Sequence, residues 1–217
     1  MAGTLERSVV RVEGKDDMHT LVHLLLRHGI DYDTKPWPPQ FPEFKESDSI
    51  EKMLQGMTTA IELSAGRTIG FVLDADSPLD DRWRAVRDRL QQVAVAAPTS
   101  PPPEGFVGES PKYRARVGVW LMPDNCHDGK LETLLSTLVE EGDSLIGHAE
   151  QATYGAKDLG ARFSEPDTIK AILHAWLAWQ EEPGCPYGTA IRARYFRHDS
   201  PAAIGFVAWF RKVFRIE

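Results

Sequence analysis

One stretch of the sequence, residues 68–76, constrains the fold of this chain more than any other. It reads Thr-Ile-Gly-Phe-Val-Leu-Asp-Ala-Asp, an apolar run that ends abruptly in Asp74 and Asp76. Such a short, continuous apolar run is typical of a strand that is buried on both faces of a sheet. Residues at i and i+2 of extended backbone point to the same side, so both carboxylates are expected to face one site. In open α/β sheets, ligands bind outside the carboxyl ends of the strands, where these two residues are expected.

Residues 8–12 repeat this arrangement near the beginning of the sequence. They are rich in β-branched residues, which favour strands, and they lead into Glu13 and Gly14. A helical pattern follows, because apolar residues recur at i, i+3, i+4 and i+7. These residues are Met18, Leu21, Val22 and Leu25. Glu13 is therefore also expected at the carboxyl end of a strand, where a glycine permits a tight turn into a helix.

The remaining periodic segments predict further helices and one more strand. A helix is expected from Asp48 as its N-cap, with Glu51 completing a capping box. Another is expected after Asp76, with Ser77 as its cap and a buried face that includes Leu79. The apolar run 117–122 predicts a strand. Helices are expected from about residue 128, over 145–160, from Pro166, and from Ser200 with Ile204, Val207 and Phe210 buried.

This alternation of strands and helices predicts an α/β fold with a mostly parallel sheet and helices on both faces. Four prolines between residues 36 and 42 indicate a loop or edge segment, and residues 98–103 a surface loop. We expect one domain over residues 1–217, in which residues 145–217 form a helical C-terminal extension.

Composition narrows the function classes. The net charge of −7 argues against nucleic-acid binding through a broad basic surface, although it is compatible with a carboxylate site that holds metal. No apolar run approaches the ~20 residues that span a bilayer, and the first residues lack the apolar region of a signal peptide. The two cysteines, Cys126 and Cys185, form neither a disulfide framework nor a metal-ligand spacing. These features predict a cytoplasmic protein without membrane contact.

If the strands are parallel, Glu13, Asp74 and Asp76 meet at one edge of the sheet. Three carboxylates in one crevice repel one another and require a counter-charge, for which Mg²⁺ or Mn²⁺ with oxygen ligands is the natural candidate. Such ions serve phosphoryl transfer. Lys15 and Lys130 are candidates for contacts with the phosphate.

These residues resemble a known pattern. A first strand that ends in Glu-Gly (residues 10–17) and a later one that ends in Asp-x-Asp resemble the Toprim domain of topoisomerases, primases and OLD-type nucleases. Residues 120–132 and 170–191 are similar to the DUF3226 group of Toprim-related bacterial proteins, so that the resemblance covers most of the chain.

The resemblance to Toprim proteins also implies roles for individual residues. Glu13 would be a metal ligand or general base, and Asp74 and Asp76 would bind metal. Glu132 would be a further acidic contributor, and Lys170 a contact to phosphate. Toprim proteins that act on nucleic acid generally work beside a further domain or partner. Nucleic acid and a partner protein are therefore the expected partners.

Three functions are compatible with the sequence. The first is a Mg²⁺-dependent, nuclease-like enzyme. The second is a HAD-like phosphatase with Asp74 as nucleophile and Asp76 as acid/base. Against it, that motif normally continues with Gly-Thr or Gly-Val near the N-terminus, whereas Ser77 and Pro78 follow here. The third is a non-catalytic binding or regulatory module. The structural alternative is that the aspartates serve as turn and cap residues, and that Glu132 and Lys170 are surface residues.

Overall fold

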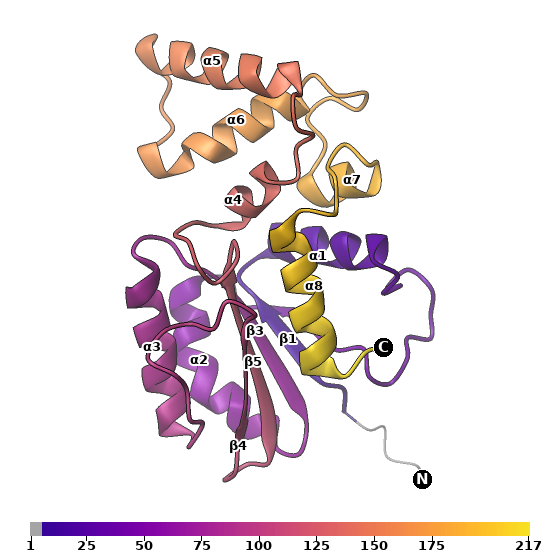
Figure 1. Cartoon of the computed structure of the whole chain (residues 1–217), viewed down its shortest axis with the longest axis vertical. Coiled ribbons are helices and arrows are strands. Elements are labelled where there is room, and N and C mark those ends of the chain that lie inside the picture. Colours follow the sequence, from indigo (N-terminus) through magenta and orange to yellow (C-terminus); the bar gives the residue numbers. More distant parts are fainter. Residues whose placement is uncertain (1–5) are drawn as a thin grey trace.

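Five strands form one sheet in the order β2-β1-β3-β5-β4 in a computed structural model that describes residues 6–217 (Figure 1). The strands are β1 (Val9–Val12), β2 (Glu43–Glu46), β3 (Thr68–Asp74), β4 (Phe106–Ser110) and β5 (Ala115–Met122). β1 pairs in parallel with β2 and β3, and β3 in parallel with β5, whereas β4 runs antiparallel at one edge. The predicted mostly parallel α/β fold is confirmed.

Helices cover both faces of this sheet. α2 (Ile50–Leu63) and α3 (Leu79–Gln92) lie on one face, and α1 (Lys15–Arg27) and α8 (Pro201–Phe214) on the other (Figure 1). The side chains of β3 alternate accordingly. Those of Ile69, Phe71 and Leu73 join the core under α2 and α3, and that of Val72 joins the core under α1 and α8.

Two glycines let α8 lie close to the centre of the sheet. A Cβ atom on Gly118 of β5 would lie 2.5 Å from Val213 Cγ2, and one on Gly70 of β3 would lie 3.0 Å from Phe214 Cζ. A larger residue at position 118 would push the helix outward, so the last turn of α8 depends on this close approach.

The remaining helices gather beyond the carboxyl end of the sheet. They are α4 (Leu131–Ser136), α5 (Ser144–Asp158), the 3₁₀ turn η1 (Glu165–Asp167), α6 (Thr168–Leu177) and α7 (Tyr187–Arg192). α5 packs against α6, α4 lies between α6 and the sheet, and α7 packs against α1 (Figure 1). None of the helices within residues 6–217 is long and apolar enough to cross a membrane.

Two predicted helix caps are wrong. The N-cap of α2 is Ser49, whose side chain accepts a hydrogen bond from Lys52 N at 3.3 Å, while Asp48 adopts a left-handed backbone with φ of 65°. Ser77 does not cap α3 either. The backbone N–H of Leu79 donates instead to Asp128 Oδ1 at 2.7 Å, from the loop before α4.

Two other predictions differ from the structure. Ile204 of α8 is 51% exposed, because it lies on the side of the helix away from the sheet. The helix expected from about residue 128 begins at Leu131, since Asp128 is used to cap α3.

Candidate functional site

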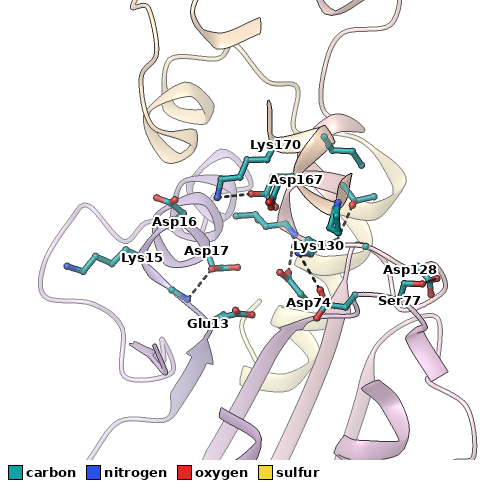
Figure 2. A pocket seen from close by; sticks show the side chains of 18 of the residues that line it. Glu13, Lys15, Asp16, Asp17, Asp74, Ser77, Asp128, Lys130, Asp167 and Lys170 are labelled. Carbon is teal, nitrogen blue, oxygen red and sulfur yellow. Dashed lines mark hydrogen bonds and ion pairs between the residues drawn. The ribbon is translucent and has the colours of Figure 1, made fainter. Parts of the chain in front are cut away.

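The predicted carboxylates meet at the carboxyl end of the sheet. Glu13 directly follows β1, Asp74 is the last residue of β3, and Asp76 lies two residues further on. With Asp17 of α1 and Glu132 of α4 they line a crevice of about 850 Å³, and Figure 2 shows the side chains of Glu13, Asp17 and Asp74 converging on it. We call these five residues and the space between them the acidic crevice.

Asp74 is a half-buried acid at the end of β3. Its Oδ1 accepts a hydrogen bond from the backbone N–H of Leu131 at 3.0 Å, which fixes the first turn of α4 to the end of β3. Burial raises the pKa of Asp74 to about 8, and the charges of the other four carboxylates raise it further in the same direction. The metal-free crevice therefore holds more negative charge than its own residues neutralise.

Asp17 also lines the crevice, although it was not among the residues predicted for the site. Its Oδ2 accepts a hydrogen bond from Gly14 N at 3.1 Å, so the side chain folds back over the first turn of α1. Burial raises the pKa of Asp17 to about 6, the hydrogen bond from Gly14 opposes this change, and the charge of Glu13 supports it. The only signal in the sequence is an acid three residues after a glycine at a helix start, which is common.

Glu13 lies in the turn that joins β1 to α1, and β1 is the neighbour of β3, which ends in Asp74. Burial raises the pKa of its carboxyl, the charge of Asp76 raises it further, and the charge of Arg82 lowers it. A carboxylate with a raised pKa is a stronger base than an ordinary surface glutamate, which suits the role predicted for Glu13.

Arg82 of α3 is a second residue that sequence reasoning missed. Its guanidinium forms an ion pair with Asp76, and its Nε donates to the backbone oxygen of Asp74 at 2.9 Å. Because Arg82 lies six residues after Asp76 across a turn, only the folded backbone brings the two together.

The predicted lysines differ in their positions. Lys130 Nζ lies 3.6 Å from Asp76 Oδ1, and Lys170 Nζ lies 3.5 Å from Glu132 Oε1. Lys15 is exposed, and Figure 2 shows its side chain pointing away from the carboxylates. Lys130 and Lys170 are thus placed for a ligand in the crevice, whereas Lys15 lines its rim.

A backbone bridge ties the turn after β3 to the loop before α4. Asp76 and Gly129 exchange two backbone hydrogen bonds of 2.9 Å each. Gly129 adopts a φ of 146°, and a Cβ atom there would lie 2.6 Å from Thr133 Oγ1, so this position requires glycine. This bridge, together with the hydrogen bond from Leu79 N to Asp128 Oδ1, connects the turn that carries Asp74 and Asp76 to the loop that carries Lys130.

The donor set of the crevice fits a hard divalent cation. All five acids offer carboxylate oxygens, which Mg²⁺ and Mn²⁺ prefer, and burial together with the charges of the other four acids raises the pKa of Asp74. Within residues 6–217, however, no three acidic, histidine or cysteine side chains are close enough to hold a metal ion as they stand. Metal binding therefore requires side-chain rotation, above all of Asp76, which is paired with Arg82 and Lys130.

Comparison with protein families gives one match. Residues 7–215 match the family described as Protein of unknown function (DUF3226). The chain belongs to the DUF3226 family. The match extends from Arg7, before β1, to Arg215, directly after α8, so all residues of the acidic crevice lie within the matched part of the chain. Comparison with curated proteins gives no match, and neither does comparison with solved structures.

Proposed function

We propose that the acidic crevice of this DUF3226 protein binds Mg²⁺ or Mn²⁺ and catalyses phosphoryl transfer of the Toprim type, with cleavage of nucleic acid as its reaction. One observation carries the proposal. Glu13, Asp74 and Asp76 come from two neighbouring parallel strands and converge in a crevice of about 850 Å³ that Lys130 and Lys170 also reach. Carboxylate oxygens that can hold a metal ion and lysine ammonium groups that can contact phosphate oxygens together form the arrangement that a metal-bound phosphate needs.

Asp74, Asp76, Glu13 and Glu132 would hold the metal. When bound, the ion would neutralise phosphate oxygens and lower the pKa of an attacking water. Glu13 would accept a proton from the attacking water, since burial and the charge of Asp76 raise the pKa of its carboxyl. Lys130 and Lys170 orient the phosphate by contacting its free oxygens. The hydrogen bond from Leu131 N orients the carboxyl of Asp74 at the end of β3.

The charge around Asp76 argues against the HAD-like alternative. In that mechanism Asp76 would donate a proton to the leaving group, which requires a protonated carboxyl. Here Asp76 Oδ2 contacts the guanidinium of Arg82 and its Oδ1 lies 3.6 Å from Lys130 Nζ, so both oxygens already face cationic donors rather than a leaving group. A covalent phosphate trapped on Asp74 would restore this alternative.

Two further expectations belong to the proposal. Nucleic acid is the substrate, and a partner protein supplies binding surface that the net charge of −7 does not. The cytoplasm is the expected location, and it is consistent with the absence of a disulfide, since Cys126 and Cys185 are both free thiols.

The test combines metal binding and cleavage on the same samples. We expect calorimetric titration to show saturable Mg²⁺ or Mn²⁺ binding by the wild type, and Asp76→Ala to weaken it by more than about tenfold, or ~1.4 kcal/mol. Asp88→Asn, an exposed acid on α3, is the matched control and should bind as the wild type does. Cleavage of single-stranded or duplex DNA or RNA should need the metal.

Each alternative outcome has a distinct meaning. Metal binding without cleavage of any nucleic acid would favour the non-catalytic binding or regulatory module. Absence of metal binding in the wild type would refute the proposal.

A further inference from the structure

A groove runs along β1 and β2, on the face of the sheet that α2 covers. It consists of two adjoining cavities of about 570 Å³ and 420 Å³, which share Arg11, Ala60 and Leu63. The strands form its floor and α2 forms its wall. Asp48 lines both the smaller cavity and the acidic crevice, so the groove opens toward the crevice.

Arg11 is the cation of this groove that lacks a partner. It forms no hydrogen bond or ion pair within residues 6–217, and its Nε is buried without an acceptor. The neighbouring cations are engaged: Lys45 lies 3.3 Å from Glu43, Lys52 3.0 Å from Asp48, and Arg67 2.9 Å from Glu6, while Arg7 donates to the carbonyls of residues 37, 38 and 41. A buried donor without an acceptor costs stability unless a ligand or water satisfies it.

Ser47 provides a second unsatisfied polar group in the smaller cavity. It is 8% exposed, and its Oγ is buried without a hydrogen-bond partner. Ser47 N donates to Val12 O at 3.0 Å, which continues the β1–β2 ladder by one residue beyond β2. In the β1–β2 register, Arg11 lies opposite Lys45. Ser47 follows Lys45 by two residues, so it lies on the same face of the sheet as Arg11 and nearer the carboxyl end of the strands.

The same register places this pair beside the acidic crevice. Glu13 follows Arg11 by two residues, which on extended backbone corresponds to ~6.6 Å along one face of the strand. Glu13 and Asp48 both line the acidic crevice, and Asp48 also lines the smaller cavity beside Arg11 and Ser47, so the two sites adjoin. A ligand that occupies the crevice could therefore extend onto Arg11 and Ser47 without crossing the sheet.

We propose that the Arg11 guanidinium and the Ser47 hydroxyl form a binding site for a phosphate-type oxyanion next to the acidic crevice. Arginine donates from a planar fork that matches the oxygens of phosphate, and a serine hydroxyl donates to a third oxygen. Glu46 and Asp48 also line this cavity, and Lys52 neutralises Asp48. A phosphate bound in this cavity would accept hydrogen bonds from both unsatisfied groups.

Free phosphate and a phosphodiester of a nucleic-acid strand share this chemistry. Binding of a phosphodiester rests on the proposed function, since the nucleic-acid strand would continue from the metal site along the groove. Binding of free phosphate does not depend on the proposed function.

The test uses the full chain without metal, in EDTA. Inorganic phosphate and a short single-stranded oligonucleotide are titrated into the wild type, Arg11→Met, Ser47→Ala and the control Arg162→Met, an exposed arginine between α5 and η1. We expect Arg11→Met to weaken phosphate binding at least about tenfold and Ser47→Ala about threefold, with Arg162→Met unchanged. No saturable binding by the wild type, or equal binding by Arg11→Met, would overturn the site.

Two further readouts separate the possible results. A higher affinity for the oligonucleotide than for phosphate, lost in Arg11→Met, assigns the site to a phosphodiester; an effect on phosphate alone assigns it to the free ion. Thermal unfolding without ligand should show Arg11→Met as stable as the wild type or more so, because the variant lacks an unpaired buried donor. Since neither measurement needs metal or turnover, loss of the metal-dependent cleavage described above would leave this result unaffected, and the reverse also holds.

Discussion

The two turns that form the acidic crevice carry the same type of side chain but balance its charge differently. In the turn between β1 and α1, Glu13 and Asp17 have only the backbone N–H of Gly14 as a fixed donor, and the pKa of both carboxyls is raised. In the turn between β3 and α3, Asp76 has Arg82 and Lys130 beside it. The first turn therefore has unbalanced negative charge, whereas the second holds its own counter-ions, which the proposed metal ion would have to displace.

Removal of Arg82 should have the largest effect on this contrast. Arg82→Met leaves Asp76 without its ion pair and the Asp74 carbonyl without a donor, so the metal-free protein should lose about 2 kcal/mol of unfolding free energy. Urea unfolding in EDTA measures this loss, and Mg²⁺ should recover part of it. Arg84→Met, on the exposed side of α3, should change stability by less than ~0.5 kcal/mol. Equal effects of the two variants would show that Arg82 is not a counter-ion for the crevice.

Neutralising one aspartate in each turn should give effects of opposite sign. Asp17→Asn removes a poorly balanced charge and keeps an acceptor for Gly14, so the metal-free protein should gain about 1 kcal/mol at pH 8. Asp76→Asn should destabilise it, because Arg82 and Lys130 lose their partner.

The pH dependence of the wild type checks the first of these effects. The folded pKa of Asp17, about 6, lies above its ordinary value of 3.8, so the folded state binds more protons between these limits. The contribution of Asp17 to stability is thus fully present below pH 3.8 and is lost as the pH rises through 6. Urea unfolding at a series of pH values should show a shallower slope in this window for Asp17→Asn. An unchanged slope would contradict the account given for Asp17.

The smallest effect is expected at the pair of Glu132 and Lys170. Lys170 is about half exposed and its Nζ lies 3.5 Å from Glu132, so Lys170→Met should change stability by less than ~0.5 kcal/mol. Because Lys170 is proposed to orient the phosphate, the same variant should instead weaken cleavage. A loss of stability comparable with that of Arg82→Met would identify Lys170 as a structural residue.

The strands that carry the acids could be predicted from sequence because they are continuous apolar runs. β1, β3 and β5 were expected within two residues of their observed bounds. β2 and β4 were not expected. β2 is a four-residue edge strand in which three residues are charged and exposed positions alternate with half-buried ones, and β4 contains Gly108 and Glu109, so neither has the pattern of a buried strand.

The site was predictable only where local sequence determines it. Glu13, Asp74 and Asp76 follow from strand ends, and the crevice brings them together as expected. Arg82, Asp17 and Asp128 act through contacts across turns or between distant loops, for which the sequence has no periodic signal. The caps expected from Asp48 and Ser77 failed for the same reason, because several neighbouring polar residues could serve and the tertiary contacts choose among them.

The close fit of α8 on Gly70 and Gly118 has a consequence for synthesis of the chain. α8 is the last helix in the sequence, yet it covers the centre of the sheet, where β3 and β5 are neighbours. When a ribosome has made all five strands, the apolar face formed by Val72, Trp120 and Met122 still lacks this cover. Until residues 201–214 emerge, the nascent chain must therefore keep that face from aggregating, either through a chaperone or through speed of translation.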